Sequence, residues 1–583
     1  MSSKSSGSGR VAFFIIGVIV LTGLTTYRLF NLTYIKHQEL ASTASGQYNN
    51  PAALLSGRGN IYFSDYSSGV KELAATNRSS YYVYSNNSGD LSKDDIAKMS
   101  REIGMSPDDL NSKVNGKGNG YLVIVKGLSK SQADTLRALN IKGIVVASEI
   151  ERFYVEDTLA SSVLGFVGFE GKQRVGQYGV ELSYDDILSG INRTQNFLGN
   201  KTYSGIIKYL KFWSKEDSQE SQGDTFPVAE GGSDIVLTLD ANIQSMVEVK
   251  LQELINKWSA EGGSIVVQDP LTGAILAMAS YPGFDPNNYS EYELSSFINP
   301  ASQKVFEPGS SFKTITMAGA IDSGAVRPDT TYNDTGQVEV AGYTIRNFDE
   351  KSNGIQTMRQ VLEHSLNTGA IFAEEKTGDD KFINYVVGFG FGQKSGVDLN
   401  GEVSGNIANL YSGRKINFLT ASFGQGIAVT PLQLVNSYSA IANGGKLMKP
   451  YLVKEVIRSD GSALKSEPVI LGAPITEKTS AQIRSMLVDV VDNGFDRARV
   501  AGYDIAGKTG TAQIPGPDGG YLGDNQFVHD FVGFAPASSP RFTILIKMDK
   551  PQGIRFAADS LSPVFGDIAR YLIRYFNIPP TRN

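Results

Sequence analysis

Residues 305–316 read VFEPGSSFKTIT and place two adjacent serines, Ser310 and Ser311, directly after a Pro-Gly pair. Apolar residues recur every three positions after them, and this spacing predicts a helix that ends near Gly324. A serine after Pro-Gly is typical of a helix N-cap, so capping alone explains both serines. Lys313 allows a second interpretation, in which one of the serines is a nucleophile with a base beside it.

The geometry of a helix selects between the two serines if one of them reacts. Residues three positions apart lie on the same face, so Lys313 faces Ser310 and Ser311 points away from it. A lysine accepts the serine proton only in its neutral form, which partial burial and a second nearby cation favour. The same Ser-x-x-Lys spacing occurs elsewhere in the chain, at 68–71, 412–415 and 462–465. The spacing therefore indicates a nucleophile only together with other residues.

Two further short motifs follow, Ser-Leu-Asn at 365–367 and Lys-Thr-Gly at 508–510. Lys508 is able to supply the second positive charge beside the base. The hydroxyl groups of Thr509 and Thr511 are able to bind a substrate carboxylate. Together with the first motif, these residues predict a site with a serine nucleophile and a lysine base.

The context of the Lys-Thr-Gly motif predicts a strand at the edge of a pocket, where Gly510 lets another backbone approach closely. A second Lys-Thr-Gly, at 376–378, follows a helical run and is interpreted as a helix C-terminus. Ser-x-Asn is the weakest motif, since it recurs at 85–87 and 404–406. His364 precedes it, and a packing or solvated role is favoured there over a catalytic one.

Composition narrows the class of protein. The 583 residues carry a formal net charge of −6, which argues against a nucleic-acid-binding protein held by bulk charge. The chain has no cysteine, so disulfides and thiolate metal sites are excluded. Its three histidines lie far apart in the sequence, so a histidine-rich metal site is not expected.

An uncharged run near the N-terminus predicts a membrane anchor at 11–32, in which Arg28 snorkels to the interface. A cleaved signal peptide is the alternative. The tail at 1–10 carries Lys4 and Arg10 without an acid, so it is expected in the cytoplasm. The expected location is the cytoplasmic membrane, crossed once, with most of the chain on its extracytoplasmic side.

The rest of the chain divides into a linker at 33–50, a mixed unit at 51–225 and a larger unit at 232–577. The larger unit has predicted strands near both ends, and helical patterns lie between them. Its clearest elements are a helix over 242–258, a strand over 541–549 and a helix over 562–576. This order predicts an α+β fold, with helices packed on an antiparallel sheet.

Ser-x-x-Lys, Ser-x-Asn and Lys-Thr-Gly, in this order, resemble the motifs of penicillin-recognising serine transpeptidases and β-lactamases. The stretches FEPGSSFK, SLNTGA and GKTGTAQ, with SGRGNIY at 56–62, are similar to class B penicillin-binding proteins. Leu366 departs from the Ser-Asp-Asn of class A β-lactamases. The resemblance implies a transpeptidase domain at 232–577, preceded by a pedestal or dimerisation domain at 51–225.

The resemblance also implies roles for the residues of the site. Ser310 would attack a peptidoglycan stem peptide that ends in D-Ala-D-Ala, with Lys313 as base and Ser365 as proton relay. Lys508 would tune the charge, and Asn367 would hydrogen-bond the donor peptide.

By the same resemblance, Thr509 and Thr511 would hold the terminal carboxylate next to Gly510. The backbone N–H groups of Ser310 and Thr511 would form the oxyanion hole. The resemblance implies neither a metal nor an organic cofactor.

The function implied is a D,D-transpeptidase that cross-links stem peptides during septal wall synthesis and is inhibited by β-lactams. The expected partners are a membrane glycosyltransferase of the FtsW type and other division proteins, and no nucleic acid is expected. The alternatives are an elongation-specific transpeptidase, a D,D-carboxypeptidase or β-lactamase, a β-lactam sensor, and a scaffold with an inactive site.

Overall fold

The computed structural model divides the chain into two compact units, one formed by residues 79–151 and the other by 57–78 together with 152 onward. The structure describes residues 57–85, 91–115, 122–171, 173–190, 231–340, 342–494, 496–516, 520–523 and 526–582. The predicted tail, anchor and linker at 1–10, 11–32 and 33–50 lie outside these ranges. Among the helices within them, none combines the length and apolar character that crossing a bilayer requires.

The smaller unit packs three helices against short strands. Strand β3 (Leu122–Leu128) pairs antiparallel with the C-terminal part of β2 (Lys71–Ser85). The helices are α4 (Lys93–Ile103), α5 (Pro107–Val114) and α6 (Lys130–Ala138), and a serine side chain caps the start of each. The core of this unit is built from Val83, Met99, Leu110, Ile124 and Leu136.

A five-stranded antiparallel sheet is the centre of the larger unit. In spatial order its strands are β18 (Ala506–Gln513), β19 (Phe527–Ala535), β20 (Phe542–Asp549), β8 (Gly262–Gln268) and β9 (Ile275–Tyr281). The inner strands β8 and β19 are buried along their whole length. Strand β18 lies at one edge, so one side of its backbone remains available for contacts outside the sheet.

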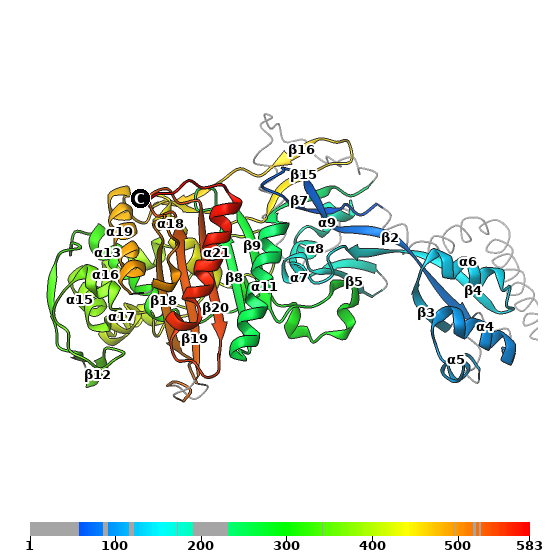
Figure 1. Cartoon of the computed structure of the whole chain (residues 1–583), viewed down its shortest axis with the longest axis horizontal. Helices are drawn as coiled ribbons and strands as arrows, with labels where there is room; N and C mark the ends of the chain where they lie inside the picture. The colour runs from blue at the N-terminus through cyan, green and yellow to red at the C-terminus, as the bar shows by residue number, and fades with distance from the viewer. Residues whose placement is uncertain are drawn as a thin grey trace, which may run out of the picture. The chain divides into compact units, whose positions relative to one another are not determined.

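Two long helices cover one face of this sheet, α11 (Ala241–Trp258) and α21 (Ser562–Tyr575) (Figure 1). Their apolar stripes pack with each other and with the strands through Val247, Leu251, Phe565, Ile568 and Leu572. The predicted α+β architecture is confirmed, and both helices were predicted within one residue of their observed bounds.

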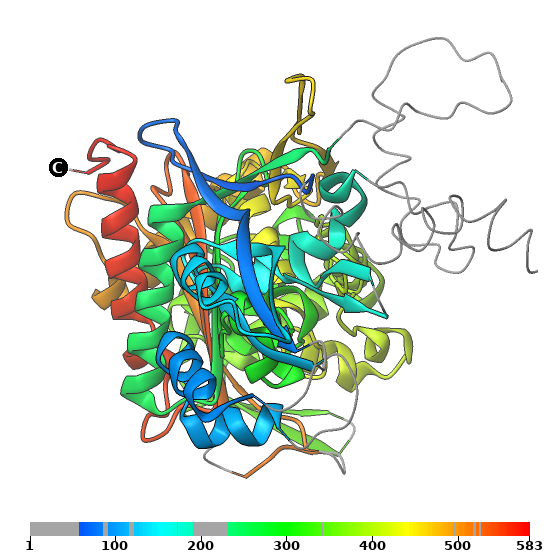
Figure 2. The same ribbon diagram turned by 90° about the vertical axis from the view of Figure 1, so that its right-hand side faces the viewer.

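The other helices gather on the opposite face of the sheet (Figure 2). They are α13 (Lys313–Asp322), α14 (Met358–Glu363), α15 (Asn367–Thr377), α16 (Asp379–Gly388), α17 (Lys415–Ala421), α18 (Pro431–Ala442) and α19 (Glu477–Asn493). Every residue of α18 is buried, and Thr430 and Gln433 form a capping box at its start. This helix contacts the sheet and supports the segments around the candidate site.

A second sheet of the larger unit joins segments that are distant in sequence. Strand β1 (Ile61–Ser64) pairs parallel with β7 (Asp234–Asp240), which pairs antiparallel with β15 (Val453–Ile457). Beneath it, the buried carboxylate of Glu181 accepts hydrogen bonds from Arg58 and Arg152. Burial alone would raise the pKa of Glu181, but the two arginines lower it below its ordinary value.

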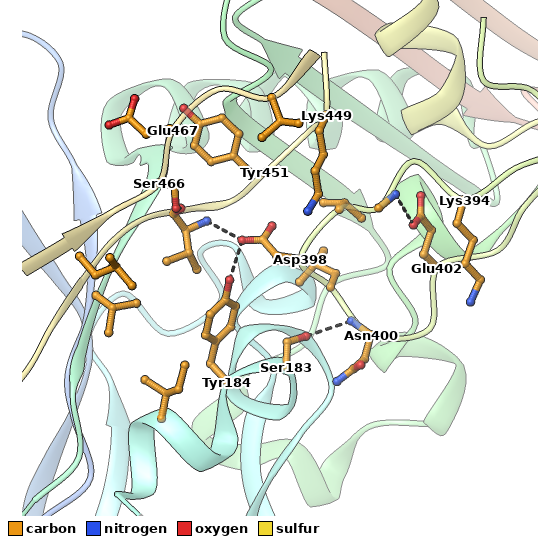
Figure 3. Close-up of a pocket in the computed structure, with 18 of the residues that line it drawn as sticks. Ser183, Tyr184, Lys394, Asp398, Asn400, Glu402, Lys449, Tyr451, Ser466 and Glu467 are labelled. Atoms are coloured by element: carbon orange, nitrogen blue, oxygen red, sulfur yellow. Dashed lines mark hydrogen bonds between the residues drawn. The ribbon is translucent and has the colours of Figure 1, made fainter. Parts of the chain in front are cut away.

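A carboxylate also links the short helices α8 (Gly179–Ser183) and α9 (Asp185–Ser189) to the loop before β15. The Tyr184 hydroxyl donates to Asp398 at 2.9 Å (Figure 3). The backbone N–H groups of Leu452 and Val453 donate to the same carboxylate at 2.7 and 2.9 Å. A largely apolar pocket of about 500 Å³ lies beside this link. Its lining residues are distinct from those of the pockets described below.

Candidate active site

The predicted nucleophile lies on a single tight turn. Residues Gly309–Phe312 form the 3₁₀ turn η5, which leads directly into α13. Because a 3₁₀ helix has three residues per turn, Lys313 follows Ser310 on the same face. Ser310 borders two pockets, whereas Ser311 is fully buried and donates to the Pro308 carbonyl at 2.9 Å.

The capping interpretation of these serines is wrong, since neither η5 nor α13 has a side-chain cap at its start. Other groups hold the turn. The Tyr438 hydroxyl of α18 donates to the Ser311 carbonyl at 2.6 Å and lies 2.7 Å from the Thr314 hydroxyl. A Cβ atom at Gly424 would lie 2.1 Å from the Gly309 carbonyl oxygen, so only glycine lets these two segments meet.

The Lys-Thr-Gly motif lies on the edge strand β18, as the sequence predicted. A Cβ atom at Gly510 would lie 2.4 Å from the Pro308 carbonyl oxygen and 2.0 Å from the Asp530 carboxylate. The close approach expected at Gly510 is therefore an approach to the serine turn. It brings β18 and Ser310 to the same pocket wall.

Two lysines from different elements converge on one hydroxyl group. Lys313 Nζ lies 3.3 Å and Lys508 Nζ 3.0 Å from Ser365 Oγ. Lys313 also donates to the Ser365 carbonyl. Ser365 has φ = 55°, a left-handed conformation that is strained for a residue with a Cβ atom. The backbone of the second motif is thus bent so that both its carbonyl and its hydroxyl face the lysines.

Burial sets the charge of the two lysines. Lys313 is 1% exposed, and burial, followed by repulsion from Lys508, holds the pKa of its ammonium group well below the ordinary value. Burial lowers the pKa of Lys508 to about 7, although Asp530 opposes this shift. Lys313 is therefore suited to accept a proton near neutral pH. The sequence predicted the direction of this shift from a second cation and partial burial, and full burial is the larger cause.

Asp530 is a member of the site that the sequence analysis did not identify. It lies opposite Gly510 on β19 and is fully buried. Burial raises the pKa of its carboxyl group to about 7, against the effect of the neighbouring Ser311, Lys508 and Lys547. Its signal in the sequence is one acid inside the buried-strand run FVHDFVGFAPA.

Two pockets meet at Ser310, and Thr511 borders both. The first has a volume of about 480 Å³ and is lined by Gly309, Ser310, Phe348, Asn367, Phe423, Gln425, Thr511, Gln513, Phe527 and Arg555. The second, of about 350 Å³, includes Ser365 and Thr509 on its wall. The Thr511 hydroxyl accepts from the Ala557 N–H at 3.1 Å, and the Asn367 amide donates to the Arg346 carbonyl at 2.8 Å.

The structure thus brings all eight predicted site residues together, from η5, α13, the α14–α15 connection and β18. The second Lys-Thr-Gly lies elsewhere: Lys376 and Thr377 end α15, and Gly378 follows with φ = 84°, as expected for a helix end. His364 is exposed beside Ser365 on the wall of the second pocket. Within the described ranges, no cluster of His, Cys, Asp or Glu is arranged to hold a metal ion.

Comparisons with known proteins agree with this arrangement of residues. Residues 263–570 match the penicillin binding protein transpeptidase domain, and residues 54–208 match the penicillin-binding protein dimerisation domain. The chain is 33% identical to stage V sporulation protein D of Bacillus subtilis, over 98% of this chain and 87% of that protein. It is 28% identical to the peptidoglycan D,D-transpeptidase FtsI of Escherichia coli, over 83% and 77% of the two chains.

A solved structure of penicillin binding protein 3 from Mycobacterium tuberculosis, complexed with ampicillin, is also similar. The two chains share 30% sequence identity and superpose with a TM-score of 0.64. The match covers 75% of this chain and 92% of the mycobacterial one.

The two Lys-Thr-Gly copies give a matched test of the site. Lys508→Ala should slow the reaction of Ser310 with benzylpenicillin by roughly 10²-fold or more, the loss expected for a preorganised charge. Removing the neighbouring cation should also raise the pKa of Lys313, so the fall in rate on acidification should begin at a higher pH. Time courses of labelling by a fluorescent penicillin, across a series of pH values, measure both effects.

Lys376→Ala is the control. Its ammonium group lies 5.3 Å from the centre of the Phe372 ring, at the end of α15. The substitution should leave the labelling rate unchanged and alter the free energy of unfolding by about 0.5 kcal/mol. Equal losses of labelling in the two variants would contradict the assignment of Lys508 to the site.

Proposed function

The chain belongs to the class B penicillin-binding proteins, and we propose that it cross-links peptidoglycan stem peptides as a serine D,D-transpeptidase. The observation that carries this proposal is the convergence of Lys313 and Lys508 on Ser365 beside Ser310. This convergence places three groups beside the nucleophile: a neutral base, a hydroxyl that relays protons, and an ammonium group.

In the first half-reaction, Ser310 Oγ transfers its proton to neutral Lys313 and attacks the carbonyl carbon of the penultimate D-alanine. The backbone N–H groups of Ser310 and Thr511 stabilise the oxyanion that forms. The C–N bond then breaks, and the amine of the terminal D-alanine takes a proton from the Ser365 hydroxyl. Lys508 donates to that hydroxyl at 3.0 Å and restores its proton.

In the second half-reaction, a neutral amine of a neighbouring stem peptide attacks the ester carbonyl of the acyl-enzyme. Its excess proton leaves through Ser365 and the lysines, and Ser310 regains its own proton as the ester bond breaks. The pocket beside Ser365, of about 350 Å³, provides room for this acceptor. Hydrolysis by water, the carboxypeptidase reaction, is the second candidate, and the products of the reaction distinguish the two.

β-Lactams should acylate Ser310 alone, because it is the hydroxyl of this turn that borders the pockets. Ser310→Ala should abolish covalent labelling by a fluorescent penicillin. Ser311→Ala should retain most of it, since the Ser311 hydroxyl is buried and donates to the Pro308 carbonyl of the turn. Peptide mapping of the adduct measures this directly, and an adduct on Ser311 would refute the assignment.

We also propose a membrane-anchored topology, with residues 11–32 as the anchor and the catalytic unit outside the cytoplasmic membrane. The uncharged run and the basic tail before it support this orientation. Protease added to intact spheroplasts should degrade the chain after about residue 30, where the anchor would end on the hydrophobic-length argument. Protection of the catalytic unit under these conditions would overturn the topology.

We further propose that the enzyme acts in septal synthesis beside a membrane glycosyltransferase of the FtsW type. The stretches HDFVGFAPASSPRFTILIKMDKPQG and SPVFGDIARYLIRYFNIPP resemble the division branch of the family and support this role. Depletion in the host should give cells that elongate without forming septa. Rounded cells would favour an elongation role, and normal growth with defective sporulation would favour a role like that in the name of the Bacillus relative.

A further inference from the structure

The two pockets at Ser310 hold different parts of the donor peptide during acyl transfer. The amine that leaves must take a proton from Ser365, and Ser365 and Thr509 border the 350 Å³ pocket but not the other one. The leaving group therefore departs through that pocket. Since the reacting carbon lies at Ser310, the acyl part of the donor peptide occupies the opposite pocket of about 480 Å³.

The acyl pocket has one charged side chain among its ten described lining residues, and it is Arg555. Its guanidinium carbon lies 5.0 Å from the centre of the Phe348 ring and 5.6 Å from that of Phe556. The two rings pack edge to face at 5.3 Å. A guanidinium group held against aromatic faces keeps its N–H groups available at its edge.

A hydrogen bond from the ring of His529 holds the backbone of Arg555 in place. The ring of His529 lies 3.1 Å from the Arg555 carbonyl through Nε2 and 2.9 Å from the Ser560 hydroxyl through Nδ1. Because a carbonyl can only accept, Nε2 carries the proton and Nδ1 accepts from Ser560. Burial lowers the pKa of this imidazole to about 4, so His529 stays neutral and in this tautomer at neutral pH.

No carboxylate of the described residues forms an ion pair with Arg555. Asp349, Glu363 and Asp559 border the leaving-group pocket. Arg555 borders the acyl pocket and not the leaving-group pocket, whereas Phe348, against which it packs, borders both. The cation faces the space where the donor peptide lies.

We propose that Arg555 is a specificity-determining residue that binds a carboxylate on the donor peptide, at the residue that precedes the penultimate D-alanine. The enzyme would then prefer donors whose third residue carries a free carboxylate over donors with an uncharged or cationic group there. An arginine forms a bidentate pair with a carboxylate, and the aromatic rings limit competing water at the guanidinium. This inference rests on the proposed transpeptidase function and on acylation of Ser310.

Three penicillins that differ in one substituent test the inference, because the penicillin side chain occupies the position of the donor residue. Benzylpenicillin has no charge at its side-chain α-carbon, α-carboxybenzylpenicillin has a carboxylate, and α-aminobenzylpenicillin has an ammonium group. The second-order rate constant for acylation of Ser310 is measured for each compound, with the full chain in detergent.

In Arg555→Gln, the ratio of the α-carboxy to the α-amino rate constant should fall about fivefold, as expected for loss of a partly exposed charge pair. In Arg555→Glu it should fall by roughly 25-fold, because the interaction reverses its sign. The rate with benzylpenicillin should fall less than that with the α-carboxy compound, since benzylpenicillin makes no charge pair.

Arg570→Gln is the control, an exposed arginine on α21 that pairs with Asp567 three residues earlier. It should leave all three rate constants unchanged. An unchanged ratio in both Arg555 variants would overturn the inference, and so would equal losses with all three penicillins. A chain that none of the penicillins acylates would instead refute the proposed function, so the two failures are distinguishable.

Discussion

The structure depends on one constraint: the side-chain amino groups of Lys313 and Lys508 are both buried and both contact the same hydroxyl group. Lys313 and Lys508 come from a helix and from an edge strand, and Ser365 lies between them on a strained connection. Two buried amino groups that contact the same hydroxyl cannot both carry a full positive charge without a large electrostatic cost. The fold resolves this by keeping Lys313 neutral, which is also the state that a base requires.

The surrounding elements hold this arrangement in place. The wholly buried helix α18 fixes the serine turn through Tyr438, and Gly424 and Gly510 let the turn approach a loop on one side and the edge strand on the other. Preorganisation of this kind places the charges before the substrate arrives, so little reorganisation is needed during the reaction. The same packing buries Ser311 and leaves Ser310 at the border of both pockets.

Much of this was predictable from the sequence where the signal is local. The helix over 242–258 and the strand over 541–549 have long apolar patterns, and both are observed within a residue of the predicted bounds. The parallel pairing of β1 with β7 was not predictable, because about 170 residues separate the strands and neither carries a register signal. Asp530 and Arg555 were missed for a related reason: each becomes significant only through neighbours that tertiary packing brings to it.

The buried pair of Asp530 and Lys508 has a consequence for the stability of the folded chain. The carboxyl pKa is raised from 3.8 to about 7, so the folded state binds more protons than the unfolded state between these values, and the free energy of unfolding falls as pH rises through them. The ammonium pKa is lowered from 10.5 to about 7, so above that point the unfolded state binds more protons and the free energy of unfolding rises again. The contribution of this pair to stability is therefore lowest near pH 7, so the buried charges that serve the site lower the stability of the fold around it.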